Sequence, residues 1–189
     1  MRKHVVIVHG WKGSPISNWQ PWLKGELEKQ GVNVSIPALP NTNEPVQEEW
    51  VETLSGVVGR PSKHTFFVTH SLGGMAVLRY LERLPKGKRI GGVVLVAGFP
   101  EWNERPESKT FFLTPLNYEK VRGSTVRGIV AIQSENDPFV PFGPNQIILK
   151  DRLGARLVVI QNGGHLNVSS DSCYVKLPLV LSTLNSLMC

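Results

Sequence analysis

The chain has 189 residues, of which 41% are hydrophobic and 19% are charged, and its formal net charge at pH 7 is +6. This composition is typical of one folded domain with a hydrophobic core, and it excludes a disordered or low-complexity chain. No apolar run approaches the roughly 20 residues that a membrane-spanning helix needs, so we expect no contact with a membrane.

Short β-branched runs alternate with amphipathic segments along the chain. The runs predict strands at residues 4–10, 32–36, 65–70, 91–98, 128–134 and 156–160. Apolar residues recur at helical spacing between and after them, which predicts helices that include residues 19–27, 46–57, 77–84, 147–153 and 177–184. Strands this apolar, separated by helices, predict an α/β fold with a mostly parallel six-stranded sheet and helices on both faces.

Residues 99–125 break this rhythm, because they mix polar and aromatic residues without a clear period. We interpret them as an irregular, lid-like excursion from a single domain that spans residues 1–189. The excursion is too short for a helical cap domain, so the fold is predicted to have no large cap.

Reactive side chains follow three of the predicted strands. Ser71 follows the third strand in THSLGG, Asp137 the fifth in SENDPFVP, and His165 the sixth in QNGGHLN. In an open α/β sheet, function gathers where the carboxyl ends of the strands meet helix N-termini. Serine, acid and histidine in this order are typical of an α/β-hydrolase triad. We therefore predict Ser71 as the nucleophile, His165 as its base and Asp137 as the carboxylate that orients the imidazole.

Two neighbours of the predicted triad offer alternative assignments. Thr69 stands where the nucleophile elbow usually has glycine, so THSLGG is a weak motif without the acid and histidine that follow it. His70 is the alternative base, although we expect it to point away from Ser71 and to pack in the core. Glu135, on the same loop as Asp137, is the alternative acid.

The substrate site is predicted from two segments. The residues HGW at 9–11 follow the first strand, where the backbone N–H of Trp11 can join that of Leu72 in an oxyanion hole. A plain turn with a core tryptophan is the alternative. A small apolar pocket for short acyl groups or small amino-acid-like esters and amides is predicted from Phe99, Trp102, Phe111, Phe112 and Phe139, with Trp11 beside them. Alternatively, these aromatic rings close the core under a long loop.

The blocks together resemble the small serine hydrolases related to retinoblastoma-binding protein 9, a family with compact bacterial members. The resemblance covers nearly the whole chain and includes VIVHGWKGSPISNWQPWL, PALPNTNEP, THSLGG, VVLVAGF, SENDPFVPF and GGHLN in this order. It implies a single-domain α/β-hydrolase fold, hydrolase activity without a cofactor, and Ser71, Asp137 and His165 as the triad. Neither cysteine lies in an L-x-C-x-E motif, so retinoblastoma protein is not carried over as a partner.

The leading hypothesis is therefore a metal-independent serine hydrolase that forms an acyl-enzyme with a small ester or amide. The absence of CxxC and HExxH motifs argues against a metal site, and the absence of G-x-G-x-x-G after the first strand argues against a dinucleotide domain. A non-catalytic binding or scaffold protein that retains the hydrolase fold is the alternative. No protein partner is predicted.

Charge and cysteine content predict the surroundings of the protein. The densest basic stretch, residues 79–89, closes a predicted helix, where cations complement the helix dipole, so we expect no nucleic-acid binding. Cys173 and Cys189 are placed in a terminal helix and at the last residue, and they form no disulfide framework. The first apolar run is too short for a signal-peptide core. We expect a cytoplasmic protein with free thiols.

Overall fold

The sheet has the predicted parallel architecture. A computed structural model describes residues 2–101, 105–168 and 173–189. Six strands form one sheet in the order β2-β1-β3-β4-β5-β6, and all five neighbouring pairs are parallel. The strands are β1 (His4–Val8), β2 (Asn33–Ser35), β3 (Thr65–His70), β4 (Gly92–Val96), β5 (Ile129–Ser134) and β6 (Arg156–Ile160).

Burial of the strands follows their place in the sheet. Every residue of β3, β4 and β5 is buried, because helices cover both faces of the sheet there. The edge strand β6 is different, since Arg156 and Val159 are exposed. The continuous apolar runs in the sequence therefore mark the central strands.

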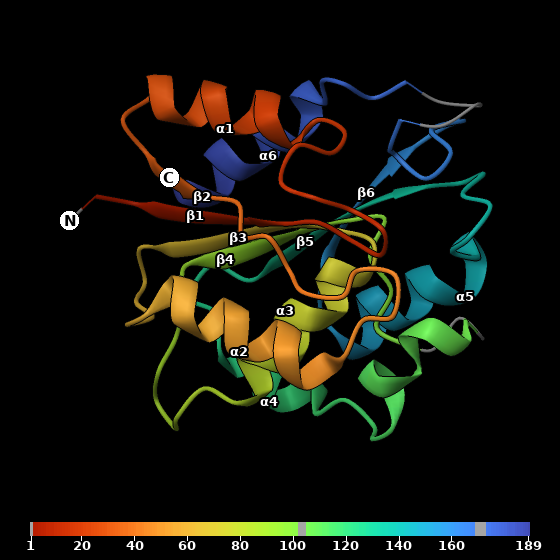
Figure 1. The fold of residues 1–189 in the computed structure, drawn as a ribbon, viewed down its shortest axis with the longest axis horizontal. Coiled ribbons are helices and arrows are strands. Elements are labelled where there is room, and N and C mark those ends of the chain that lie inside the picture. The colour runs from red at the N-terminus through yellow and green to blue at the C-terminus, as the bar shows by residue number, and fades with distance from the viewer. Residues whose placement is uncertain (1, 102–104, 169–172) are drawn as a thin grey trace.

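Helices form a layer on each side of the sheet (Figure 1). On one face, α1 (Gln20–Lys29) and α6 (Pro178–Met188) share a core cluster with Trp19, Leu23 and Val180. The other face carries α2 (Gln47–Val58), α3 (Leu72–Glu82), α4 (Tyr118–Gly123) and α5 (Phe142–Ile147), with a short π-helical turn at Ile148–Arg152 after α5. None of the described helices is long and apolar enough to cross a membrane.

The described residues 105–125 of the predicted excursion are more ordered than their sequence pattern predicts. They contain a 3₁₀ helix, Pro106–Phe112, and then α4. Phe111 is fully buried and packs edge-on against Trp50 of α2, with ring centroids 5.4 Å apart. The buried guanidinium of Arg79 in α3 donates hydrogen bonds to the carbonyl oxygens of Phe111 and Thr114. These contacts fasten the segment to the core.

The prediction for one cysteine is wrong. Cys173 precedes α6 and forms an isolated antiparallel bridge with Val168, so it does not lie in the terminal helix. Cys189 is the last residue, and both thiols are free and exposed.

Pro178 begins α6 because proline fits the first turn of a helix, where its missing N–H costs no intrahelical hydrogen bond.

Candidate active site

Ser71 lies on a sharp turn between β3 and α3. Its φ is 52° and its ψ is −128°, a conformation that costs a residue other than glycine about 1–3 kcal/mol. The Ser71 N–H donates to the carbonyl oxygen of Val96, 2.9 Å away, which ties the turn to β4. The Ser71 side chain forms no hydrogen bond to the N-terminus of α3. The strained turn leaves the hydroxyl directed toward His165.

Close contact between backbones explains the glycines around the serine. A Cβ at Gly73 would lie 2.4 Å from the carbonyl oxygen of His9, and one at Gly10 would lie 2.9 Å from the Cβ of Ser71. The loop after β1 and the turn after β3 therefore pack directly against each other. Gly74 leaves room for Thr69, whose Oγ1 would lie 3.2 Å from a Cβ there.

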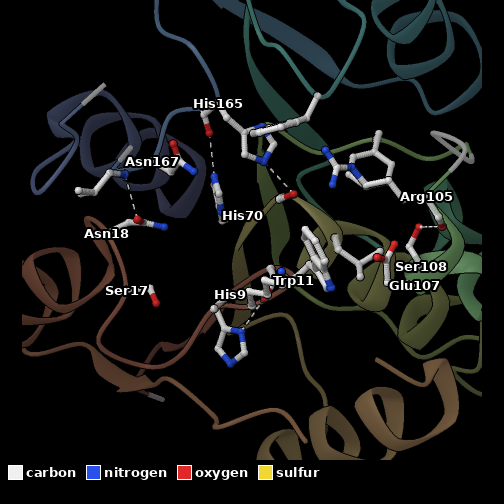
Figure 2. Close-up of a pocket in the computed structure, with 18 residues that line it drawn as sticks. His9, Trp11, Ser17, Asn18, His70, Arg105, Glu107, Ser108, His165 and Asn167 are labelled. Carbon is white, nitrogen blue, oxygen red and sulfur yellow. Dashed lines mark hydrogen bonds between the residues drawn. The ribbon is translucent and has the colours of Figure 1, made fainter. Parts of the chain in front are cut away.

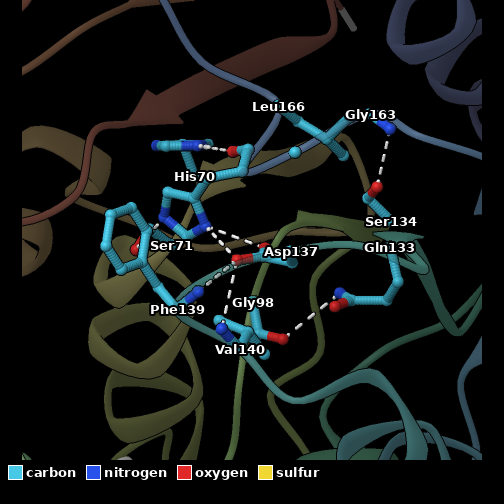
Figure 3. Close-up of polar contacts among 12 residues, drawn as sticks. His70, Ser71, Gly98, Gln133, Ser134, Asp137, Phe139, Val140, Gly163 and Leu166 are labelled. Atoms are coloured by element: carbon cyan, nitrogen blue, oxygen red, sulfur yellow. Dashed lines mark hydrogen bonds and ion pairs between the residues drawn. The ribbon is translucent and has the colours of Figure 1, made fainter. Parts of the chain in front are cut away.

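His165 connects Ser71 to Asp137 (Figure 3). The Nε2 of His165 lies 2.9 Å from Ser71 Oγ, and its Nδ1 lies 3.0 and 2.8 Å from the two carboxylate oxygens of Asp137. The carboxylate can only accept, so Nδ1 carries the proton and Nε2 is left to accept from the serine hydroxyl. Asp137 Oδ1 also accepts the N–H groups of Phe139 and Val140, at 2.9 and 3.1 Å. The structure thus brings the three predicted residues together.

The loops that carry Asp137 and His165 are joined by side chains that the sequence did not single out. Ser134 Oγ accepts the Gly163 N–H at 2.8 Å and donates to Asn136 Oδ1 at 2.8 Å. Asn136 Oδ1 also accepts the N–H of Gly164, again at 2.8 Å. These bonds fix the distance between the two loops. The only sequence signal for these two side chains is that Ser134 and Asn136 are polar and lie close to the predicted acid in SENDP.

His70 is buried and hydrogen bonded, as expected, and it also contacts His165 and lines the cavity. Its Nε2 donates to the carbonyl oxygen of His165 at 2.9 Å, and the two rings meet edge to face at 4.9 Å (Figure 3). Burial, and then the charge that His165 can carry, lower the pKa of His70 to about 3. His70 is therefore a neutral support for His165 and a poor candidate for the base.

The alternative acid does not reach His165. Glu135 is exposed, and its backbone N–H donates to the carbonyl oxygen of Ile160. The carboxylate bonded to His165 belongs to Asp137, and its side chain is only 1% exposed. The geometry selects Asp137 over Glu135.

The loop after β1 carries the predicted oxyanion donor, Trp11. His9 shapes this loop, because its Nδ1 donates to the Gly10 carbonyl oxygen and its Nε2 accepts the Leu39 N–H. Burial lowers the pKa of His9, which keeps the ring neutral in this role. Trp11 and Leu72 both line the cavity at Ser71, and Leu72 is the first residue of α3, where backbone N–H groups have no partner within the helix.

A cavity of about 320 Å³ opens beside Ser71 and His165 (Figure 2). Of the predicted pocket residues, Phe99 and Phe139 line it, as does Trp11. Phe139 is 44% exposed and packs edge-on against the ring of His165 at 5.0 Å.

Phe111 and Phe112 are wrong as lining residues of this cavity. Phe111 is fully buried in the core, whereas Phe112 is half-buried, stacks on Phe99 and lines a second hollow with Tyr118. Hydrophobic burial draws the Phe111 ring inward, as the alternative interpretation expected. Trp102 lies outside the described residues.

The lining also includes the apolar residue Val168 and the polar or charged residues Lys12, Ser17, Asn18, Arg105, Glu107, Ser108 and Asn167. The cavity lining is therefore mixed, whereas the sequence predicted an apolar pocket. In the part of the chain that the structure describes, no three His, Cys, Asp or Glu side chains are grouped so that they could hold a metal ion.

Known proteins resemble this chain over nearly its whole length. The sequence model of a family described as serine hydrolase matches residues 5–186. YdeN of Bacillus subtilis (strain 168), which is named as a hydrolase, is 35% identical over 187 residues, which are 98% of this chain and 96% of YdeN. The crystal structure of the B. subtilis ydeN gene product has a TM-score of 0.90 at 34% identity and covers 98% of both chains.

A more distant structure shows the same fold. Est1E from Butyrivibrio proteoclasticus has a TM-score of 0.73 at 15% identity, over 99% of this chain and 87% of that chain. The predicted single-domain α/β-hydrolase fold is thereby confirmed.

Proposed function

The chain belongs to the serine hydrolase family and is a serine hydrolase, and from this premise we propose that it cleaves a small ester or amide through an acyl-enzyme on Ser71. One observation carries the proposal. The Oγ of Ser71, the imidazole of His165 and the carboxylate of Asp137 form a continuous line of hydrogen bonds at 2.9 and 2.8 Å. In this arrangement, the imidazole can take the serine proton and the carboxylate can stabilise the imidazolium.

The first half of the reaction forms the acyl-enzyme. Ser71 Oγ attacks the substrate carbonyl carbon while His165 Nε2 takes the hydroxyl proton. The carbonyl oxygen becomes an oxyanion, and the backbone N–H groups of Trp11 and Leu72 stabilise it. When the tetrahedral intermediate collapses, the bond to the leaving group breaks and His165 gives the leaving group its proton.

The second half releases the acid. His165 takes a proton from water, and the resulting hydroxide attacks the acyl carbon. Collapse of the second intermediate returns the proton to Ser71 Oγ. Ester and water become acid and alcohol, and the mechanism requires no metal or cofactor because the nucleophile and base are side chains.

The cavity supports a small substrate. Its volume of about 320 Å³ lies near the lower limit of roughly 300–1,000 Å³ for ligand pockets. We also assign the chain to the group related to retinoblastoma-binding protein 9, on the sequence blocks quoted above. The two exposed, unpaired cysteines support a cytoplasmic protein. Nucleic acid, membrane and protein partners have no role in this proposal.

Covalent labelling tests the proposal and the scaffold alternative together. A fluorophosphonate probe should label Ser71 in the wild type, and Ser71→Ala should abolish labelling. Turnover of p-nitrophenyl acetate should fall about 10⁴- to 10⁶-fold in Ser71→Ala. Ser182→Ala, at an exposed position of α6, is the matched control and should behave as wild type. A wild-type protein that neither reacts with the probe nor hydrolyses any ester would contradict the proposal and favour the scaffold alternative.

A further inference from the structure

The loop that carries His165 depends on other parts of the chain for its position. Residues 161–167 follow β6 and belong to no helix or strand. Leu166, next to His165, has a φ of 52°, a strained conformation that persists only where the surrounding structure holds it. Ser134 and Asn136 hold the part of the loop before His165. The part after His165 is held by a different pair of residues.

Asn18 and Trp19 bond to the loop after His165, although they lie 147 residues or more before their partners in the chain. The indole N–H of Trp19 donates to the carbonyl oxygen of Leu166 at 2.9 Å. Asn18 Oδ1 accepts the N–H of Val168 at 3.0 Å (Figure 2). These two bonds flank a single residue of the loop, so they fix both the position and the direction of its backbone.

The Trp19 side chain is itself fixed in the core. It is fully buried and belongs to the same core cluster as Leu23 of α1. Its ring meets that of His70 edge-on at 6.2 Å, and His70 Nε2 donates to the carbonyl oxygen of His165 at 2.9 Å. Trp19 therefore supports the loop directly at Leu166 and, through His70, at His165.

Asn18 meets two requirements of its position. Its φ is 55°, in the left-handed region that asparagine adopts more readily than most residues. Its side chain also supplies an acceptor oxygen for a backbone N–H, which can only donate. The residue type at position 18 thus suits the turn and the bond to Val168 together.

The position of this loop decides where the imidazole lies. His165 Nε2 is 2.9 Å from Ser71 Oγ, and Nδ1 is 2.8 Å from Asp137 Oδ2. A shift of the backbone moves the imidazole relative to both partners. Since a misplacement of about 1 Å can cost about 10²-fold in rate, bonds that hold the loop affect proton transfer without contact with the reacting atoms.

We propose that Asn18 and Trp19 are positioning residues for the base. They hold the backbone after His165 and so keep Nε2 within reach of Ser71 Oγ. This inference rests on the proposed hydrolysis at Ser71 and adds two residues, from the segment between β1 and α1, that act on the reaction through His165.

Two matched tryptophan variants test the proposal. Trp19→Phe removes the indole N–H and keeps an aromatic ring. Trp50→Phe is the control, because Trp50 is also fully buried and its indole N–H donates to the carbonyl oxygen of Pro40 at 2.8 Å, on the other face of the sheet. Both variants should unfold at a lower temperature than wild type. With p-nitrophenyl acetate, kcat should fall about 10- to 100-fold in Trp19→Phe while KM stays within about threefold, and kcat of Trp50→Phe should stay within about threefold of wild type.

A double-mutant cycle shows whether the effect passes through the base. His165→Ala removes the imidazole, so adding Trp19→Phe to it should change the residual kcat by less than about twofold. A general loss of packing would instead lower kcat by the same factor with and without the imidazole.

Asn18 is tested without a change in the core. Asn18→Gly removes the acceptor oxygen, and glycine adopts a φ of 55° without strain. Its kcat should fall about tenfold, whereas Asn18→Asp keeps an acceptor oxygen and should lose less. If Trp19→Phe does not fold, these two variants decide the proposal, and equal losses of kcat in them would overturn it.

The outcomes separate this inference from the function on which it rests. If Ser71→Ala and His165→Ala are inactive while Trp19→Phe and Asn18→Gly keep wild-type kcat, the positioning role is wrong and the hydrolase proposal stands. If Trp50→Phe loses as much kcat as Trp19→Phe, packing of the core and not the position of His165 explains the loss. If Ser71→Ala hydrolyses the ester as well as wild type, the proposed function fails.

Discussion

Replacement of Asp137 by asparagine removes the negative charge beside His165 and preserves the size of the side chain. In the native site, Oδ1 accepts the N–H groups of Phe139 and Val140, and Oδ2 lies 2.8 Å from His165 Nδ1. The amide oxygen of asparagine can retain the two backbone bonds only at the Oδ1 position. Its NH₂ group then takes the place of Oδ2 and faces Nδ1 of the imidazole.

This substitution changes the tautomer of His165. Oδ2 lies 2.8 Å from Nδ1 and Oδ1 lies 3.0 Å from it, so the NH₂ group takes the shorter contact and favours the tautomer in which Nδ1 accepts and Nε2 carries the hydrogen. Nε2 then donates to Ser71 Oγ, 2.9 Å away, and can no longer accept the serine proton. The same change in other serine hydrolases with this arrangement lowers kcat about 10⁴-fold, which corresponds to about 5.5 kcal/mol of transition-state stabilisation. We expect a loss of this size for Asp137→Asn.

The assay compares kcat for p-nitrophenyl acetate at pH 8 in wild type, Asp137→Asn and Glu135→Gln. Glu135→Gln removes a carboxylate from the same loop, and it should keep wild-type activity because that side chain is exposed. Thermal unfolding should show both variants folded, since the hydrogen bonds to Phe139 and Val140 survive. The tautomer argument would be refuted if kcat of Asp137→Asn lay within tenfold of the wild-type value. It would also be refuted if Glu135→Gln lost most of its activity.

Further predictions concern the supports of the site. Gly73→Ala should lower the free energy of unfolding by about 1–3 kcal/mol or more in urea titrations, because its Cβ would lie 2.4 Å from the His9 carbonyl oxygen. Gly25→Ala, with nothing within 4 Å, should not destabilise the protein. His70 has a folded pKa of about 3 against 6.5 unfolded, so its contribution to stability is lost as pH falls below about 6.5. That loss reaches about 2 kcal/mol at pH 5, and His70→Asn should flatten the measured pH dependence. Asn136→Ala should lower kcat about 10- to 100-fold with little change in KM, because it removes the oxygen that joins the two loops. Asn136→Asp keeps this acceptor oxygen, so its kcat should fall less. Equal losses of kcat in the two variants would rule out a positioning role for Asn136.

The position of the reactive residues follows from local patterns. Apolar runs between amphipathic segments indicate buried parallel strands, and a parallel sheet places all its carboxyl ends on one edge. Ser71, Asp137 and His165 each follow such a strand, so their meeting could be predicted before any contact was known. The glycines after the serine point to a tight turn for the same local reason.

Long-range packing decides what the sequence left open. His70 faces the same side of β3 as Phe66 and Val68, and the loop after β6 crosses this side, where the indole N–H of Trp19 donates to the carbonyl oxygen of Leu166. The sequence pattern of a strand predicts which of its side chains share a face of the sheet. It does not predict which distant loop covers that face.

The aromatic residues predicted for the pocket show the same limit. Phe111 and Phe139 are equally apolar, yet the first is fully buried against Trp50 and the second borders the cavity. Phe111 is buried because the neighbouring helix α2 covers its ring through Trp50. Residue type and spacing therefore determined the fold and the places of Ser71, Asp137 and His165 at the ends of strands, because these depend on local periodicity and chain order. The shape and charge of the cavity depend on contacts between loops far apart in the chain, so only the tertiary structure decided them.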